Sequence, residues 1–446
     1  CAVAAVVGVL SYPDDRSLVI VTSATPRRLA GEGGVRDVGV VVRTAFLPFK
    51  PNTPDQWQPP TERQASDGKE AAPAVIGAKL RAQLKEMLEA GDFFVAPGFG
   101  LTHTLARRCA GGRGGGWADA DDRFVWNAAA LSPLADAGDG AWLSPLVHGS
   151  VLTETIETRG VRLSVSLVAR RSVEHAGTRF KTRGVNDDGG AANFVEIEQL
   201  VHVQTAHASA CSSFVQVRGS APLFWEQRGK SVNPKPRTTR SEELTLPTLR
   251  RHLDGLRARY GGLALLSLLE QRGDEAELAA ALVRHIDLLR ADDGGGGGPL
   301  DVPIVSFDFH AQCKASRNDG LRHLVRALEP TLGAHAFTSA SPCDGGAAPV
   351  VRRKQGGVLR TNCLDCLNRT NMAQAALALH AATAQIADSG VIVDGTAASE
   401  AQSALRRLWG ETGDALSLQY TGTANLSRGT GIAEGDAKKS LMEKGF

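Results

Sequence analysis

The sequence is poor in several features that would define a protein class. Its 446 residues include only seven cysteines, three tyrosines and three methionines. An odd, sparse set of cysteines argues against a disulfide framework and for a reducing compartment. Basic residues number 50 and acidic residues 48, so neither sign of charge dominates. This balance excludes a strongly basic chain that coats nucleic acid, and we expect no nucleic-acid partner.

Long hydrophobic runs are also missing. The longest apolar run, at residues 1–10, falls well short of the ~18 residues that a membrane span needs. It also lacks the basic leader and small-residue cleavage site of a signal peptide. Because the chain begins with Cys1 rather than methionine, we expect it to be a fragment of a longer protein, and a membrane anchor could follow Phe446.

What is present is typical of a globular protein. Hydrophobic residues make up 42% of the chain, and its length predicts two or three domains with a buried core. Glycine is abundant, with 49 residues, and it gathers at 111–116 and 294–298, where we expect loop insertions. A polar segment at 51–73 is expected to be an exposed loop.

Local patterns predict a mixture of strands and helices. Strands are expected at 2–10, 18–22, 38–44, 161–168, 178–183, 193–204, 213–218, 302–307 and 358–359. Helices are expected at 79–90, 249–260, 276–289, 321–328 and from 370 onward. The mixture favours an α+β or α/β fold, and no internal repeat is present.

One segment carries the pattern of a nucleophilic site. Cys363 and Arg369 enclose five residues between an expected strand and an expected helix. A tight loop that opens a helix turns its N–H groups inward and binds anions, and the helix dipole adds positive charge. This positive field lowers the pKa of a thiol. A guanidinium binds two phosphate oxygens through two parallel N–H groups. The segment therefore predicts attack of a Cys363 thiolate on phosphorus and a cysteinyl-phosphate intermediate.

Two other interpretations of the segment stay open at this point. In the first, Cys363 is a buried thiol and Arg369 is an exposed residue at the start of a helix. Alternatively, Cys363 and Cys366 form a C-x-x-C redox or zinc pair. Zinc is disfavoured because the sequence has no second such pair and no histidine at ligand spacing, and a redox pair leaves Arg369 without a role. We expect no metal and no cofactor.

At this loop the sequence resembles the Sac-domain (suppressor-of-actin) phosphoinositide phosphatases, whose signature is R-x-N-C-x-D-C-L-D-R-T-N. Residues 360–371 read Arg-Thr-Asn-Cys-Leu-Asp-Cys-Leu-Asn-Arg-Thr-Asn. The resemblance continues through most of the chain in family order. The matching blocks are residues 169–172, 176–180, 184–188, 192–199, 214–225, 307–310 and 408–423.

The resemblance implies an N-terminal Sac subdomain of mixed strands and helices at 1–145. It implies a cysteine-phosphatase-like catalytic domain at 146–446, with a central sheet and a C-x5-R phosphate loop. The implied activity is metal-independent removal of phosphate from inositol lipids, most often phosphatidylinositol 4-phosphate. The implied partner is a phosphoinositide headgroup at the cytosolic face of endoplasmic reticulum, Golgi or endosomal membranes, unless the protein is cytosolic. A tethering partner or a C-terminal anchor would then hold it there.

Within this resemblance we assign four catalytic residues. Cys363 is the nucleophile, Arg369 holds the phosphoryl group, and Thr370 assists the hydrolytic step. The aspartate that precedes the loop arginine in the family is Asn368 here, and an amide cannot donate a proton as a carboxylic acid does. We therefore assign the general acid to Asp365. The departure also keeps open a catalytically impaired phosphoinositide-binding scaffold.

Further residues are expected to contact the substrate. These are Arg360, Asn362, Leu364, Cys366, Leu367, Asn368, Lys354, Arg179, Arg183 and His310. Arg179, Lys181 and Arg183 alternate along one expected strand, where they could equally be a solvated face. A basic cluster at Arg352, Arg353, Lys354 and Arg360 is expected to meet an anionic bilayer. His310 could instead be a hydrogen-bonded core residue, and Glu196 and Glu198 are expected to pair with arginines such as Arg218.

Overall fold

The structure is a computed structural model. It describes residues 3–13, 15–31, 34–49, 73–111, 116–135, 143–179, 181–228, 234–291, 300–341, 349–365 and 367–422. The expected glycine-rich loop at 294–298, the expected polar loop except its last residue, and most of 111–116 lie outside these ranges. The chain forms two compact units. One comprises Cys1–Leu29 and Val35–Val151, and the other comprises Ala30–Gly34 and Leu152–Phe446.

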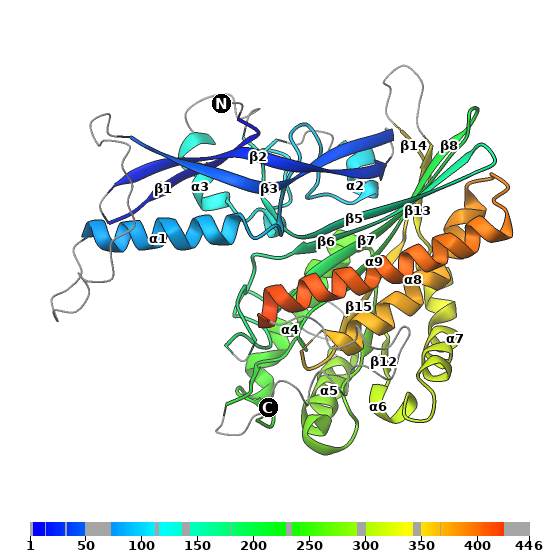
Figure 1. The fold of residues 1–446 in the computed structure, drawn as a ribbon. Helices are drawn as coiled ribbons and strands as arrows, with labels where there is room; N and C mark the ends of the chain where they lie inside the picture. Colours follow the sequence, from blue (N-terminus) through cyan, green and yellow to red (C-terminus); the bar gives the residue numbers. More distant parts are fainter. Residues whose placement is uncertain are drawn as a thin grey trace, which may run out of the picture. The chain divides into compact units, whose positions relative to one another are not determined.

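The first unit is built on antiparallel strands. Its strands are β1 (Ala5–Ser11), β2 (Arg16–Gly31), β3 (Gly34–Pro48), β4 (Phe93–Val95) and the start of β5 (Val147–Thr158). Its helices are α1 (Pro73–Leu88), α2 (Leu105–Cys109), η2 (Asp122–Phe124) and α3 (Ala128–Ala135). Alternate strand residues such as Val19, Val21 and Val41 point into one core, and Leu88 of α1 packs against them. Figure 1 shows α1 running along β1, β2 and β3.

The second unit has a mixed sheet at its centre. The strands are β6 (Val161–Arg171), β7 (Val195–Gln204), β8 (Ser209–Arg218), β11 (Gly262–Ser267), β12 (Ile304–Ser306), β13 (Thr338–Ser341), β14 (Val350–Arg353) and β15 (Gly357–Asn362). Strands β6, β7 and β8 are antiparallel neighbours, and β8, β15, β11 and β12 then run parallel in that order. Parallel strands end at one edge of the sheet, which is where α/β proteins place ligands.

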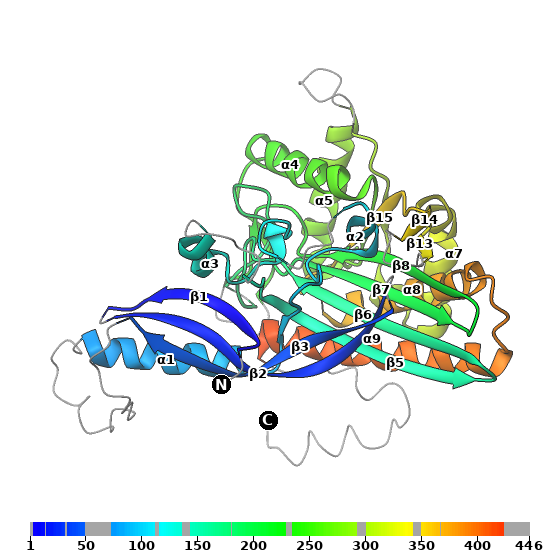
Figure 2. The same cartoon turned by 90° about the horizontal axis from the view of Figure 1, so that it is seen from above.

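Helices cover both faces of this sheet. They are α4 (Glu242–Tyr260), η4 (Gly273–Glu275), α5 (Ala276–Ala291), α6 (Phe309–Gln312), α7 (Arg317–His335), α8 (Asn368–Asp388) and α9 (Gly395–Thr421). A separate short ribbon joins β9 (Trp225–Glu226) to β10 (Arg237–Thr238). Helices α8 and α9 lie on one side of the sheet and α4 lies on the other (Figures 1 and 2). Adjacent strand residues face opposite ways, so Leu359 packs with α7, α8 and α9, while Val358 packs with α4 and α5.

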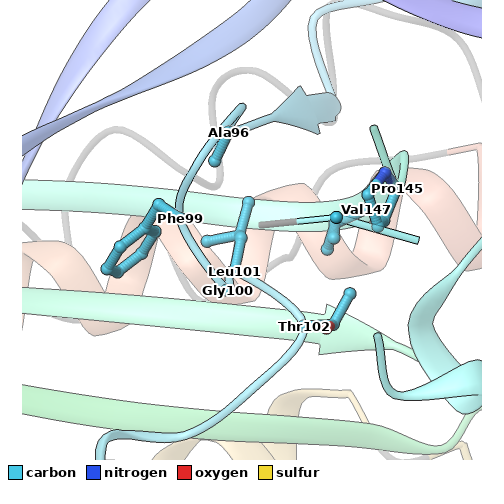
Figure 3. A pocket seen from close by; sticks show the side chains of 8 residues that line it. Ala96, Phe99, Gly100, Leu101, Thr102, Pro145 and Val147 are labelled. Atoms are coloured by element: carbon cyan, nitrogen blue, oxygen red, sulfur yellow. The ribbon is translucent and has the colours of Figure 1, made fainter. Parts of the chain in front are cut away.

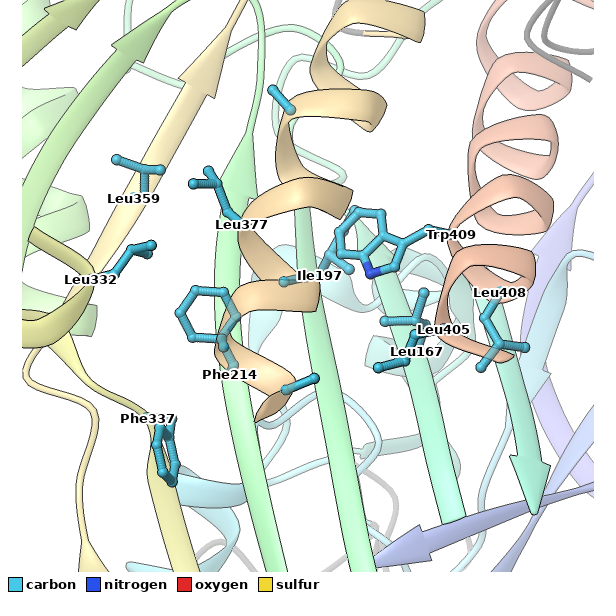
Figure 4. Close-up of a cluster of buried hydrophobic side chains, with 14 of the residues drawn as sticks. Leu167, Ile197, Phe214, Leu332, Phe337, Leu359, Leu377, Leu405, Leu408 and Trp409 are labelled. Atoms are coloured by element: carbon cyan, nitrogen blue, oxygen red, sulfur yellow. The ribbon is translucent and has the colours of Figure 1, made fainter. Parts of the chain in front are cut away.

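The larger core lies under α7, α8 and α9. In Figure 4, Leu377 of α8 lies on the side of that helix that faces Leu359 of β15, and Trp409 of α9 points toward Ile197 of β7. Alanines such as Ala378 on α8 and Ala404 on α9 are fully buried, and small side chains let these helices approach the sheet closely. The strand and helix that flank the cysteine loop are therefore both anchored in one apolar core.

The mixed α/β architecture predicted from the sequence is confirmed, although individual elements differ. The expected strand at 178–183 is wrong, because the N–H groups of Lys181 and Thr182 donate to the carbonyl of Thr178 and form turns. Phe180, within that segment, lies outside the described residues. The long helix α9 was not expected, since much of its buried face is alanine, threonine and glycine rather than large apolar side chains.

Candidate active site

Cys363 lies at the junction between β15 and α8. Strand β15 is buried along its whole length, and Cys363, the next residue, has only 2% of its surface exposed. Thr370, in the first turn of α8, is fully buried, and its hydroxyl donates to Cys363 Sγ at 3.2 Å. A hydroxyl donor favours a negatively charged acceptor, so this contact suits a thiolate.

Two side chains from the preceding part of the chain hold the loop backbone. Arg183 Nη1 donates to the carbonyl of Leu364 at 3.0 Å, and Asn193 Nδ2 donates to the carbonyl of Asp365 at 3.2 Å. In a trans peptide the carbonyl and the next N–H point in opposite directions. Because Arg183 binds the Leu364 carbonyl, the N–H of Asp365 points away from Arg183. Asn193 has a φ of 50°, a left-handed conformation that asparagine tolerates better than most residues.

The carboxylate of Asp365 lies between two arginines. Arg179 Nη2 is 2.7 Å from one carboxylate oxygen, and Arg183 Nη2 is 2.6 Å from the other. The Arg183 side chain is 3% exposed, while Arg179 is 34% exposed. The turn at 178–183 thus brings both arginines to the loop, although the expected strand is absent.

Arg369 is held by acceptors that follow strand β11. Its Nη1 donates to the carbonyl of Leu268 at 3.2 Å and to Glu275 Oε2 at 2.9 Å. Its Nη2 donates to Glu275 Oε1 at 2.6 Å. Burial, the largest single influence, lowers the pKa of Arg369, but the charge of Cys363 and the bond to Glu275 outweigh it and raise the pKa above its ordinary value. Arg369 is therefore a permanent cation near Cys363.

Arg360 and Asn362 lie inside the protein, in strand β15. Arg360 is fully buried, and it donates from Nε to His252 Nε2 at 2.9 Å and from Nη2 to the carbonyl of Ser220 at 2.6 Å. His252 Nδ1 lies 2.8 Å from the carbonyl of Gly189. Burial, with the charge of Arg360, lowers the pKa of His252 to about 3. A neutral His252 that accepts a hydrogen bond from Arg360 fixes the end of β15. Asn362 is also fully buried, and its amide lies beside the hydroxyl of Ser267.

The remaining expected contacts are spread over several elements. Leu367 is buried directly before α8, Asn368 is its first residue, and Leu364 is partly exposed. Cys366 lies outside the described residues. Lys354 is exposed after β14, where Arg352 and Arg353 form ion pairs with Asp388. His310, on α6, is exposed and pairs with Glu270 at 3.4 Å, so it is not a core residue.

A buried polar network supports the first turn of α8 from the neighbouring strands. Glu196 and Glu198 both pair with Arg170, at 3.0 and 2.6 Å, as the expected pairing of these glutamates with arginines predicts. Neighbouring antiparallel strands place these side chains together on one face. Arg218 donates to Asn371 in α8. Sequence analysis also missed Glu275, which lies 94 residues before its partner Arg369.

A pocket in the first unit offers less chemistry. It is lined by Ala96, Phe99, Gly100, Leu101, Thr102, Gly116, Pro145 and Val147 (Figure 3). None of these side chains is ionisable, and the space of about 10 Å³ is the size that one water molecule needs. The cysteine loop of the second unit is therefore the candidate active site.

Comparison with known proteins shows the family of the chain. Residues 4–314 match the family model described as SacI homology domain. The chain belongs to this family. Rat synaptojanin-1 is 36% identical over 71% of the chain, and human phosphatidylinositide phosphatase SAC2 is 31% identical over 78% of it. Phosphoinositide phosphatase SAC8 from Arabidopsis thaliana is 33% identical over 73%.

The chain covers only part of these relatives. The matched region is 19% of synaptojanin-1, 32% of SAC2 and 53% of SAC8. Among the described helices, none has the length and apolar character that a membrane crossing requires.

Proposed function

We propose that the chain is a phosphoinositide phosphatase that removes a phosphate monoester from the inositol ring through a cysteinyl-phosphate intermediate. The observation that carries this proposal is the Thr370 hydroxyl, 3.2 Å from a buried Cys363 Sγ at the start of a helix. Helix N–H groups and a hydroxyl donor together favour a thiolate over a neutral thiol. A thiolate beside the Arg369 cation is suited to attack phosphorus in a bound phosphate group.

The proposed reaction has two displacement steps. In the first, a sulfur–phosphorus bond forms at Cys363 while the bond from phosphorus to the inositol oxygen breaks, and Asp365 gives its proton to that leaving oxygen. In the second, water attacks phosphorus and gives a proton to the Asp365 carboxylate, the sulfur–phosphorus bond breaks, and the thiolate returns as inorganic phosphate leaves. Thr370 assists this second step. Arg369 and the loop N–H groups stabilise the charge on the phosphoryl oxygens in both.

The substrate assignment rests on charge and on the relatives. Arg179 and Arg183 lie beside the loop, where guanidinium groups suit the phosphates of an inositol headgroup. Both SAC2 and SAC8 carry phosphoinositide phosphatase names. We propose phosphatidylinositol 4-phosphate as the preferred lipid, met at the cytosolic face of an intracellular membrane.

Replacing the nucleophile tests the proposal directly. Cys363→Ser is expected to lower phosphate release from short-chain phosphatidylinositol 4-phosphate by at least ~1000-fold, because a serine hydroxyl is not ionised near neutral pH. Cys313→Ser, at the partly exposed end of α6, is the matched control and should keep wild-type turnover. Equal activity of Cys363→Ser and wild type would remove Cys363 from the mechanism.

A second candidate function is a lipid-binding protein with impaired catalysis. It is favoured by Asn368, the first residue of α8, which stands where the family signature has aspartate. This function predicts vesicle binding with little turnover, and a gain of turnover in Asn368→Asp. Fast turnover of the wild-type chain, unchanged in Asn368→Asp, would exclude it.

A further inference from the structure

Glu275 and Arg369 form a pair in which both partners are fixed. Glu275 ends η4 and is 7% exposed. Its Oε1 accepts from Arg369 Nη2, and its Oε2 accepts both from Arg369 Nη1 and from the backbone N–H of Glu270 at 3.0 Å. The turn after β11 therefore holds the carboxylate, and the carboxylate with the Leu268 carbonyl holds the guanidinium.

The geometry of this pair leaves one edge of the guanidinium for a ligand. A guanidinium has five N–H donors, and three of them point to Leu268 and Glu275. The two others are the Nε–H and the second N–H of Nη2, which are parallel and lie on the same edge. Such an edge is the fork that binds two oxygens of one phosphate group. Glu275 binds the Nη1–Nη2 edge of the guanidinium, and the Nε–Nη2 edge remains for the phosphate oxygens.

From these contacts we infer that Glu275 is a positioning residue that aims the Nε–Nη2 edge of Arg369 at the phosphoryl group. The inference rests on the proposed phosphatase function and extends it to a residue outside the cysteine loop. Orientation before the reaction matters because a donor stabilises transition-state charge only if no reorganisation is needed.

A simple charge effect predicts the opposite result. Glu275 neutralises Arg369, and Glu270 adds a second negative charge nearby. If these charges only weaken the pull of Arg369 on a phosphate dianion, removing one should tighten phosphate binding and raise turnover. A fall in turnover when Glu275 is removed therefore indicates positioning, and a rise indicates that Glu275 only neutralises Arg369.

The test is Glu275→Gln, which keeps the size of the side chain but places an amide donor against the Arg369 donors. We expect kcat on short-chain phosphatidylinositol 4-phosphate to fall about 10- to 100-fold. The dissociation constant of inorganic phosphate, measured by calorimetry, should rise several-fold. Glu277→Gln is the matched control, since Glu277 is 56% exposed and lies 3.7 Å from Lys235. It should match wild type in both measurements. An increase in kcat or tighter phosphate binding in Glu275→Gln would overturn the inference.

A double-mutant cycle distinguishes an effect of Glu275 through Arg369 from a general loss of folding. Arg369→Lys removes the fork, so Glu275→Gln should add little further loss of kcat in that background. Additive losses would mean that Glu275 acts through the fold rather than through Arg369, and would overturn the inference.

The two proposals fail in different ways. If wild type turns over the lipid while Glu275→Gln behaves like Glu277→Gln, the inference is wrong and the phosphatase proposal stands. If wild type releases no phosphate from inositol lipids but Glu275→Gln still weakens phosphate binding, the proposed function is wrong and the positioning role stands.

Discussion

At the scale of single residues, the site depends on side chains that come from outside the cysteine loop. Asp365 is the clearest example, since Arg179 and Arg183 contact its two carboxylate oxygens. A residue in this place has two uses: it can give a proton to the leaving oxygen, or it can hold the two arginines beside the loop. An asparagine keeps hydrogen-bond acceptance but cannot act as the acid.

Leaving-group dependence separates these two uses of Asp365. If Asp365 is the general acid, Asp365→Asn should lower kcat on an inositol phosphate by roughly 100-fold or more. The loss should be small on para-nitrophenyl phosphate, whose phenolate leaves without protonation. Equal losses on the two substrates would assign Asp365 to holding the arginines instead.

His252 provides a residue-scale test of the interior. Its pKa is about 3 in the folded protein, against an ordinary value of 6.5. Below pH 6.5 the unfolded state binds a proton that the folded state excludes, so stability is full above pH 6.5 and falls as the pH drops toward 3. The expected slope is roughly 1.4 kcal/mol per pH unit from this group.

Urea unfolding at several pH values measures this effect. The slope between pH 6.5 and 4.5 should be smaller in His252→Gln by roughly 1.4 kcal/mol per pH unit, whereas His207→Gln, at an exposed position, should keep the wild-type slope. A slope that is the same in wild type and His252→Gln would show that His252 is not buried in neutral form.

At the scale of elements, the start of α8 is held by α9. Asn371 Nδ2 donates to the carbonyl of Trp409 at 2.9 Å. A Cβ atom added at Gly413, also on α9, would lie 2.5 Å from that nitrogen. The glycine is therefore required by close packing rather than by backbone conformation, and it protects the contact that supports the first turn of α8.

Two glycines of α9 give a matched pair. Gly413→Ala should destabilise the protein by about 1–3 kcal/mol through overpacking. Gly410→Ala, with open space around the added Cβ, should stabilise it by up to ~1 kcal/mol, because alanine favours a helix more than glycine does. Thermal unfolding compares them, and equal shifts in the two variants would contradict the packing described for Gly413.

The strand, loop and helix around Cys363 were predictable because their signals are local. An apolar pair before the cysteine and a helical pattern after Thr370 identify β15 and α8. The error at 178–183 has a similar origin. Alternating arginine and lysine imitates the period of a strand, but it carries no apolar face that a sheet would bury.

At the scale of the whole molecule, the partners of the site residues could not be read from the chain. Glu275 and Arg369 are 94 residues apart, and Arg183 and the Leu364 carbonyl are 181 apart. Such pairs follow from the parallel order of β8, β15 and β11, which no local pattern encodes. Length, composition and the expected mixture of elements agreed with the fold, whereas its strand order had to come from the structure.

The central claim is that Cys363 forms a bond to phosphorus during turnover. Rapid acid quenching of the enzyme with short-chain phosphatidylinositol 4-phosphate, followed by mass spectrometry of the peptide that contains Cys363, tests it. We predict a phosphate adduct on that cysteine within the first turnover, with no divalent metal added, and its loss in Cys363→Ser. Steady product formation with no adduct at any quench time would contradict the account.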